Sequence, residues 1–284
     1  MPNEPAVLNG DVYEISNAGQ LYWFADQVNI YGNTAINGKL MADIVVNENV
    51  LDANGILNGN SSPFRRWNPI GWDSASKYTG IFDDSGNTVS GLFFGDAAAD
   101  YVGLFGYVYY GGVAGINRGS AVSDCNNADI VRGTKYVGGI VGSNQISGVL
   151  IQNLVSTIDC CYNTGIVKGD TYIGGIAGAN KVNGSWNSSV VDSVCTLTNC
   201  YNTGSIDGNN YVGGVAGINS VGGIVSSKSM TSVTNCHNVG TIRYGTDIGG
   251  VIGANDGKAE KTSVLQPDEG HRVRQQDHLH LLGG

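Results

Sequence analysis

One heptapeptide recurs along this chain and constrains its fold more than any other feature. The pattern is Gly-Gly-(Val/Ile)-(Ala/Val/Ile)-Gly-x-Asn, and its five copies begin at Gly111, Gly138, Gly174, Gly213 and Gly249. A reduced form, Tyr-Val-Gly-Leu-Phe-Gly, precedes them at 101–106. Self-similarity at a period of about 20–50 residues is typical of repeat proteins, in which each coil buries its apolar face against its neighbours.

A second signature, Cys-x-Asn, shares the register of the first. Its cysteines are Cys125, Cys161, Cys200 and Cys236, and each lies 13 residues before the next Gly-Gly pair. The distance forward from Gly-Gly to the next cysteine is instead 14, 23, 26 and 23 residues. The basic coil is therefore 27 residues long (14 + 13), and later coils carry insertions of 9, 12 and 9 residues at one corner.

A coil this short cannot form its own core, so it must stack on its neighbours through parallel ladders about 4.8 Å apart. We predict three extended runs per coil and a roughly triangular cross-section. The runs are the Tyr-Val-Gly-Gly-Val-Ala-Gly segment, the run into Cys-x-Asn, and the run around the Val or Ile six residues after each cysteine. The sequence thus predicts an all-β chain that forms a parallel β-solenoid.

The composition of the chain argues against nucleic acids and membranes as partners. With a formal net charge of −9, the chain lacks the basic surface that nucleic-acid binding needs. No run approaches the roughly 18 apolar residues of a membrane span, so we expect no membrane insertion. The first residues also lack signal-peptide features, from which we expect that an export signal has been removed. We expect no cofactor and no metal site, and a monomer or part of a longer chain.

The recurring asparagines allow two interpretations. Asparagine tolerates left-handed backbone and bonds to nearby main chain, so these residues fit turns whose stacked amides also bond along the axis. A polar binding strip is the alternative. We favour structural ladders, formed by Asn117, Asn144, Asn180, Asn219 and Asn255 and, after each cysteine, by Asn127, Asn163, Asn202 and Asn238.

The cysteines Cys125, Cys161, Cys200 and Cys236 should form a column, with Cys160 and Cys195 outside the register. Buried free thiols are the interpretation that we favour, because cysteine packs as a small hydrophobe. Disulfides are an alternative in an exported protein, and a metal site is the weakest, since the spacing of about 36 residues matches the repeat rather than a metal motif.

Tyrosines precede three of the Gly-Gly pairs by two residues, at Tyr136, Tyr172 and Tyr211, and Tyr101 and Tyr109 stand in a similar position. A stack of these rings would cover a hydrophobic flank, and it could also serve as a carbohydrate platform. Asp247 interrupts the row in the last unit, which weakens a continuous platform.

The chain ends differ from the repeats. Leu21, Phe24, Ala25 and Val28 have helical spacing behind a Ser16 or Asn17 cap, which predicts a short amphipathic helix at 16–28 that caps the solenoid. Strands are expected at 40–46, 68–72, 78–82 and 88–94. Asp83 and Asp84 fit a turn better than a calcium loop. His278 and His280, tag-like or metal ligands by type, lie in a tail that we expect to be mobile.

These features divide the chain into four parts. We expect a disordered start (1–10), a cap helix with irregular first coils (11–100), the repeat solenoid (101–257) and a flexible tail (258–284).

The repeated Tyr-Val-Gly-Gly-(Ile/Val)-x-Gly-x-Asn and the Cys-Tyr-Asn-Thr-Gly at 161–165 and 200–204 resemble the GLUG-motif repeats of bacterial surface proteins. Segments 40–44, 67–71 and 80–92 are similar to the usual lead-in to such repeats, so the resemblance covers about residues 11–257. It implies a right-handed parallel β-helix in a large exported protein, as in the non-catalytic region of M26 IgA-specific metallopeptidases. It implies no single activity, and the His-Glu-x-x-His motif of a zinc peptidase is missing from this chain.

We therefore expect a non-catalytic structural or adhesive module, secreted or at the cell surface. Binding of a glycan or a host surface protein would use the insertions at 145–157, 181–196 and 220–232, which share one corner; a mutually packed ridge without a ligand is the alternative. The candidate binding residues are Trp186, Asn187, Tyr136, Tyr172 and Tyr211. The enzyme alternative is a carbohydrate-active β-helix, a lyase or a hydrolase, but the repeats hold few carboxylates and no basic cluster beside them.

Overall fold

The structure is a computed structural model of the 284-residue chain. It describes residues 2–50, 58, 64–72, 76–93, 101–106, 109–119, 121–147, 153–184, 192–223, 225, 228–260 and 263–264. The chain divides into two compact units, Met1–Ile116 and Asn117–Gly284.

The first unit begins with a hairpin. Strand β1 (Val7–Asn9) pairs antiparallel with β2 (Val12–Ile15), and Gly10 makes the turn with a φ of 64°. Residues 7–9 are therefore ordered as a strand rather than part of a disordered start, because the main chain of β2 supplies their hydrogen-bond partners.

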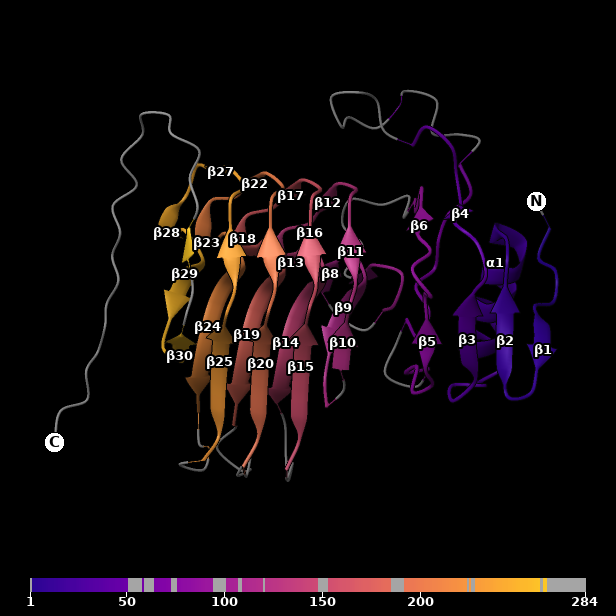
Figure 1. The fold of residues 1–284 in the computed structure, drawn as a ribbon, viewed down its shortest axis with the longest axis horizontal. Coiled ribbons are helices and arrows are strands. Elements are labelled where there is room, and N and C mark those ends of the chain that lie inside the picture. Colours follow the sequence, from indigo (N-terminus) through magenta and orange to yellow (C-terminus); the bar gives the residue numbers. More distant parts are fainter. Residues whose placement is uncertain are drawn as a thin grey trace, which may run out of the picture. The chain divides into compact units, whose positions relative to one another are not determined.

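The other described strands of the first unit are short and pair in parallel (Figure 1). Strand β3 (Asn37–Leu40) pairs with β2, and β5 (Phe82–Asp83) pairs with β3. Two further parallel pairs are β4 (Ile44–Val45) with β6 (Val89–Ser90) and β7 (Tyr101–Val102) with β8 (Tyr109–Gly111); β9 (Ala114–Asn117) crosses the division between the units. The strand expected at 40–46 is split, because Asp43 turns its carboxylate to the backbone N–H and hydroxyl of Thr88.

The predicted helix is present as α1 (Ala18–Asn29). Asn17 is the N-cap, and its Oδ1 accepts a hydrogen bond from the backbone N–H of Gln20 over 3.0 Å. The face predicted from the spacing is the buried one: Leu21, Phe24, Ala25 and Val28 are all in the core. The helical period of the sequence thus decided both the element and its buried side.

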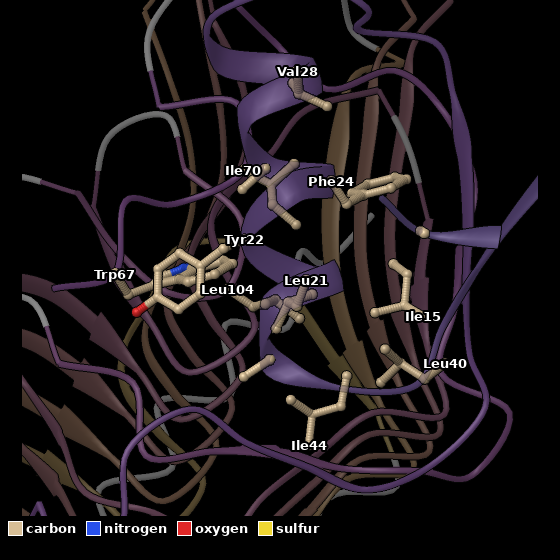
Figure 2. Close-up of a cluster of buried hydrophobic side chains, with 13 residues drawn as sticks. Ile15, Leu21, Tyr22, Phe24, Val28, Leu40, Ile44, Trp67, Ile70 and Leu104 are labelled. Carbon is tan, nitrogen blue, oxygen red and sulfur yellow. The ribbon is translucent and has the colours of Figure 1, made fainter. Parts of the chain in front are cut away.

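Figure 2 shows the core that α1 covers. Phe24 meets Phe82 with ring centroids 5.7 Å apart, and Tyr22 meets Trp67 edge-on at 5.1 Å. The Trp67 indole N–H donates to the carbonyl of Gly103, so this large buried side chain leaves no polar atom unsatisfied. The helix belongs to the first unit's own core; its role as a cap on the solenoid stays a prediction.

The second unit is the solenoid. Each of four successive coils contributes one strand to each of five parallel sheets, which we number first to fifth in chain order (Figure 1). The described part of the chain after them adds a strand to the first and second sheets. The first sheet contains β10 (Ala121–Ser123), β15 (Val155–Asp159), β20 (Val194–Thr198), β25 (Met230–Thr234) and β30 (Lys258–Glu260). The second contains β11 (Asn126–Asn127), β16 (Tyr162–Asn163), β21 (Tyr201–Asn202), β26 (His237–Asn238) and β31 (Ser263–Val264). The third contains β12 (Val131–Arg132), β17 (Val167–Lys168), β22 (Ile206–Asp207) and β27 (Ile242–Arg243).

The last two sheets hold the Gly-Gly signature. The fourth contains β13 (Lys135–Gly138), β18 (Thr171–Gly174), β23 (Asn210–Gly213) and β28 (Thr246–Gly249) in this unit. The fifth contains β14 (Val141–Ser147), β19 (Ala177–Asn183), β24 (Ala216–Gly222) and β29 (Ile252–Asn255). The register pairs equivalent residues of successive coils, such as Val141 with Ala177 and Ala177 with Ala216. This confirms the predicted parallel β-solenoid.

The predicted three runs per coil are wrong, because the coil has five strands. The chain bends at the Gly-Gly pair, so the Tyr-Val-Gly-Gly-Val-Ala-Gly run is divided between the fourth and fifth sheets. A Cβ on Gly138 would collide with the carbonyl oxygen of Val141 across this bend, which explains why the position is glycine. The run into Cys-x-Asn is likewise divided between the first and second sheets.

Candidate functional site

The tyrosines Tyr136, Tyr172 and Tyr211 form one stack along the solenoid. Ring centroids are 4.8 Å apart between Tyr136 and Tyr172 and 4.9 Å between Tyr172 and Tyr211, and the rings are within 14° of parallel. All three residues have left-handed backbone, with φ between 53° and 60°, which aims each ring at the same side of its coil. Asp247 has the same backbone conformation, so the last coil keeps the turn without an aromatic ring.

This stacking limits what the tyrosines can bind. Because Tyr172 lies between Tyr136 and Tyr211, both of its ring faces are covered by aromatic neighbours. A sugar that stacks on an aromatic ring needs an open ring face, and Tyr172 presents only its edge and hydroxyl. The geometry therefore favours the covering of a flank over a flat carbohydrate platform. The side chains of Tyr101 and Tyr109 lie outside the described residues.

A second aromatic stack was missed from the sequence. Tyr162 and Tyr201 have ring centroids 5.1 Å apart and planes within 3° of parallel, and His237 continues their register in the next coil. The repeated Cys-Tyr-Asn-Thr-Gly motif could have predicted this stack, because residues that follow the stacked cysteines occupy equivalent positions in successive coils. Tyr201 is 42% exposed, so this stack lies on the surface of the second sheet.

A pocket of about 210 Å³ adjoins the first tyrosine stack on the outer side of the fifth sheet. It is lined by Tyr136, Tyr172, Lys181, Val182, Asn183, Ile218, Ser220 and Gly222. The tyrosines come from β13 and β18, and the other residues come from β19 and β24. Two of the predicted binding residues, Tyr136 and Tyr172, thus line one pocket. The polar side chains that line it with them were not predicted from the sequence to lie nearby.

The register explains why this pocket exists. Lys181 pairs with Ser220 in the fifth sheet, and Asn183 pairs with Gly222. Each tyrosine lies over the fifth-sheet strand of the following coil: the Lys181 Nζ is 4.1 Å from the Tyr136 ring centroid, and a Cβ on Gly217 would touch the backbone of Tyr172. The register partner of Lys181 is Ser220, so a short side chain lies in the coil beside Tyr172 where a lysine lies beside Tyr136.

Lys181 carries an electrostatic cost in this position. Its own burial and the positive charge of Lys135 lower the pKa of its ammonium group to about 8. Lys135 Nζ itself is 5.2 Å from the Tyr136 ring centroid and 5.7 Å from that of Tyr172. Two cations therefore share the rings at one end of the pocket.

The asparagine ladders are in the interior. In the first ladder each amide donates to the next side-chain oxygen, over 2.9 Å from Asn117 to Asn144 and 2.8 Å in every later step to Asn255. In the second, from Asn127 through Asn163 and Asn202 to Asn238, the distances are 2.7, 2.7 and 2.8 Å. All of these residues except Asn255 are buried, so they form structural ladders and not an open polar strip.

The second ladder also closes a turn in every coil. Asn163 Nδ2 donates to the carbonyl of Gly165 over 3.0 Å, and Asn202 Nδ2 donates to that of Gly204 over 2.9 Å. One amide thus satisfies a local turn and the next coil together, which is the double role predicted from the residue type.

The cysteine column is present, and its four cysteines are thiols that form no disulfide. Cys161, Cys200 and Cys236 are buried, and each Sγ donates to the carbonyl two residues earlier over 3.2, 3.0 and 3.3 Å. Contact with the Cys161 and Cys236 thiols, together with burial, raises the pKa of Cys200. These thiols therefore pack as small buried side chains.

The two cysteines outside the column differ from each other. Cys160 is exposed. Cys195 is buried in the first sheet, in register with Ser156 and Thr231, and burial raises the pKa of its thiol to about 12.

The corner insertions lie between the fifth and first sheets. Where they occur, the flanking strands are longer: β15 has 5 residues against 3 in β10. Between the extended strands Ile146, Val182 and Cys195 form a small buried cluster with Leu154 and Val225 against it. The bases of the insertions are thus packed against one another, while Trp186 and Asn187 lie outside the described residues.

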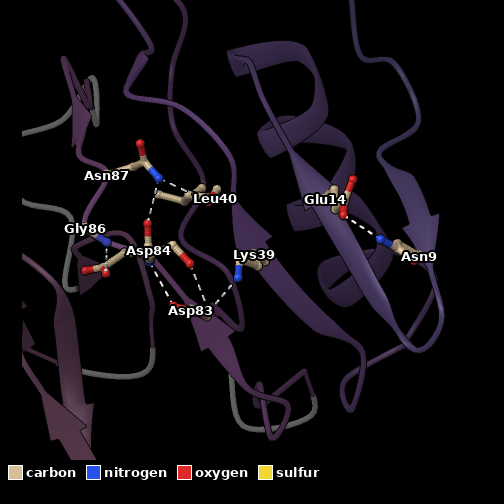
Figure 3. Close-up of polar contacts among 9 residues, drawn as sticks. Asn9, Glu14, Lys39, Leu40, Asp83, Asp84, Gly86 and Asn87 are labelled. Atoms are coloured by element: carbon tan, nitrogen blue, oxygen red, sulfur yellow. Dashed lines mark hydrogen bonds and ion pairs between the residues drawn. The ribbon is translucent and has the colours of Figure 1, made fainter.

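Asp83 and Asp84 form a turn, as predicted (Figure 3). The backbone N–H and hydroxyl of Ser85 donate to the Asp83 carboxylate, which lowers its pKa, and Lys39 Nζ lies 3.4 Å from it. Asp84 accepts from the N–H of Gly86 over 2.9 Å. In the described part of the chain, no three His, Cys, Asp or Glu side chains are grouped to hold a metal ion. His278 and His280 lie outside that part.

Among the described residues, no helix has the length and apolar character needed to cross a membrane.

No family model, no curated protein and no solved structure matches the chain.

Proposed function

We propose that this chain is a structural repeat module of an exported bacterial cell-surface protein, which projects or presents a surface. The observation that carries the proposal is the use of the repeated residues. The asparagines that recur in every coil are hydrogen-bonded to the next coil inside the solenoid, and three of the four recurring cysteines, Cys161, Cys200 and Cys236, are buried. Residues that repeat in order to stack one coil on the next indicate a structural role. A catalytic or binding site would instead need a set of different residues gathered at one place.

The ladders favour a stiff module. Each buried amide finds its partner in the adjacent coil, so bending the stack would break several hydrogen bonds in a dry interior at once. A stiff, extended element suits a spacer that holds another part of a protein away from a cell. The resemblance to GLUG-motif repeats supports the same class of function.

An adhesive role at the insertion corner is part of the proposal. The extended strands and the cluster of Ile146, Val182 and Cys195 provide a firm base for the segments that carry Trp186 and Asn187. Binding of a glycan or a host surface protein there stays a prediction. Replacement of 185–190 by a short Gly-Ser linker should abolish such binding on a glycan or host-protein array without changing the far-UV circular dichroism spectrum.

Surface location can be tested on intact cells of the source bacterium. An antibody raised against the purified chain should label unpermeabilised cells, and external protease should remove the epitope while a cytoplasmic marker survives. Labelling that requires permeabilisation would contradict the proposal.

Incubation with acidic and neutral polysaccharides tests the enzymatic alternative separately. The structural proposal predicts no new reducing ends and no unsaturated products. Cleavage that persists after repeated purification would establish a carbohydrate-active enzyme instead.

A further inference from the structure

The pocket beside the tyrosine stack combines features that suit one class of ligand. Lys181 and Asn183 form one side, Ser220 lies in the coil that follows, and Ile218 and the edge of Tyr172 supply apolar contact. The volume of about 210 Å³ is below the roughly 300–1,000 Å³ of pockets for drug-sized ligands. The pocket therefore has room for one small unit of a larger molecule.

The charges on this face favour an anion. The outward rows of the fifth sheet are Ser143, Ala179 and Ile218; Gln145, Lys181 and Ser220; and Ser147, Asn183 and Gly222, and none of these residues is acidic. Lys135 adds a second cation beside the same rings. The Arg118 guanidinium donates to the carbonyl of Ser147, whose register partner is Asn183. This basic patch is local, because the whole chain has a net charge of −9.

We propose that the pocket between Lys181 and Tyr172 binds a uronic acid residue of an acidic polysaccharide. The ligand carboxylate lies at the Lys181 ammonium group, where it offsets the repulsion from Lys135. The Asn183 amide and the Ser220 hydroxyl contact the sugar hydroxyls, and Ile218 with the Tyr172 edge contacts the apolar face of the sugar. The open groove lets neighbouring sugars of the chain continue into solvent.

The proposal rests on the pocket alone and is independent of the structural role proposed above. A chain that fails to bind uronates would still be a repeat module, and a chain that binds them need not lie at a cell surface.

Isothermal titration calorimetry with a galacturonic acid trimer, and with the galactose trimer as the neutral counterpart, tests the proposal. The acidic trimer should bind, and the neutral trimer should bind at least about tenfold more weakly because it lacks the charge-assisted contact. An acidic peptide, a glutamate trimer, is the third probe. Equal affinity for the neutral trimer, or for the glutamate trimer, would overturn the assignment to a uronic acid.

Two variants locate the site. Lys181→Met keeps the stem that covers the Tyr136 ring and removes the charge, so affinity for the acidic trimer should fall about tenfold. Ser220→Lys fills the pocket with the residue that the preceding coil already has in this register, so it should fold normally and lose binding. Lys168→Met on the third sheet, where Lys168 pairs with Asp207, is the matched control and should bind like the wild type.

Lys181 itself gives a readout that does not depend on affinity. In the free protein its ammonium group should titrate near the lowered pKa of about 8, and saturation with the acidic trimer should raise this pKa, because a nearby carboxylate favours the charged amine. Carbon-13 NMR of labelled lysine measures both values. Binding retained by Ser220→Lys, or a Lys181 pKa unchanged at saturation, would show that the ligand lies elsewhere.

Discussion

The side-chain amide of Asn180 donates a hydrogen bond to Oδ1 of Asn219 over 2.8 Å, although 39 residues of chain separate them. The same amide also donates to the carbonyls of Cys195 and Ser232, which belong to two coils of the first sheet. Asn180 thus joins the fifth sheet to the first and one coil to the next. Both residues are completely buried, so no water replaces a lost partner.

Asn180→Ala should therefore destabilise the solenoid strongly. The substitution removes the hydrogen bonds that Asn180 donates to Asn219 and to two carbonyls of the first sheet, and the one that it accepts from Asn144. Each buried hydrogen bond contributes about 0.5–1.5 kcal/mol. We expect the free energy of unfolding, measured by urea denaturation, to fall by roughly 2–4 kcal/mol. Asn183→Ala, three residues along the same strand but exposed, is the control and should change it by less than about 0.5 kcal/mol.

Gly178→Ala should also be destabilising, for a steric reason. A Cβ at this position would lie 2.5 Å from the backbone carbon of Tyr136 and from the nitrogen of Val137, and backbone cannot move aside as a side chain can. Overpacking of this kind costs about 1–3 kcal/mol. At Gly222, in the same sheet, the nearest atom would be Asn183 Oδ1 at 3.3 Å. Thermal melts in which Gly178→Ala is as stable as Gly222→Ala would show that the coils have room for a methyl group at Gly178.

Tyr244→Gly should stabilise the chain. Tyr244 has a left-handed backbone with φ of 62°, and its side chain is 75% exposed, so it is strained without the contacts that offset the strain at the stacked tyrosines. Glycine removes the strain but loses more entropy on folding, which leaves a net gain of about 0.5–1 kcal/mol in unfolding free energy.

The contrasting variant is Tyr211→Gly. It has the same backbone conformation, with φ of 53°, but its ring stacks on Tyr172. Loss of the stack should outweigh the relief of strain, so urea denaturation should show opposite signs for the two variants. Equal signs would mean that the stack contributes nothing to stability.

Ionisation of Cys195 should make the free energy of unfolding fall at alkaline pH. The pKa of its thiol is about 12 in the folded chain against an ordinary value of 9.0. Below pH 9 the thiol is neutral in both states, so its contribution is fully present. Above pH 9 the unfolded chain releases this proton first, so the free energy of unfolding falls as pH rises towards 12. The loss from this thiol between pH 9 and about 10.5 should be roughly 1–2 kcal/mol.

The comparison with Cys195→Ala isolates this effect from other titrating groups. Urea denaturation of both chains across this pH range should show a steeper fall for the wild type. Parallel curves would indicate that the Cys195 thiol ionises as readily in the folded chain as in the unfolded one. Alkylation followed by peptide mass spectrometry adds a direct check, in which exposed Cys160 should react well before Cys195.

Several features of the site could be predicted from the spacing of the repeats in the sequence. The constant 13-residue spacing from cysteine to Gly-Gly predicted that equivalent residues stack, and the register places Asn144, Asn180 and Asn219 in one row. The tyrosine stack followed from the same register. The Tyr162–Tyr201 stack could have been found in the same way, because both residues follow a cysteine of the column.

The pocket could not be predicted, because it depends on an offset between sheets. Tyr172 lies over the fifth-sheet strand of the following coil, so its neighbours include Ile218 and Ser220, far away in sequence. The chain is divided into two strands at the Gly-Gly pair, where the sequence predicted one extended run.

The amino-acid sequence by itself determined the parallel solenoid, the α1 helix and the residues that repeat along the axis. It could do so because the spacing of identical residues along the chain becomes their stacking in space when each coil pairs with the next in parallel register. The tertiary structure alone decided that each coil has five strands, that the bases of the insertions pack around Ile146 and Val182, and that Lys181 lies beside an aromatic pocket. Those features depend on how the chain bends between sheets, where steric contacts between distant residues outweigh any local preference.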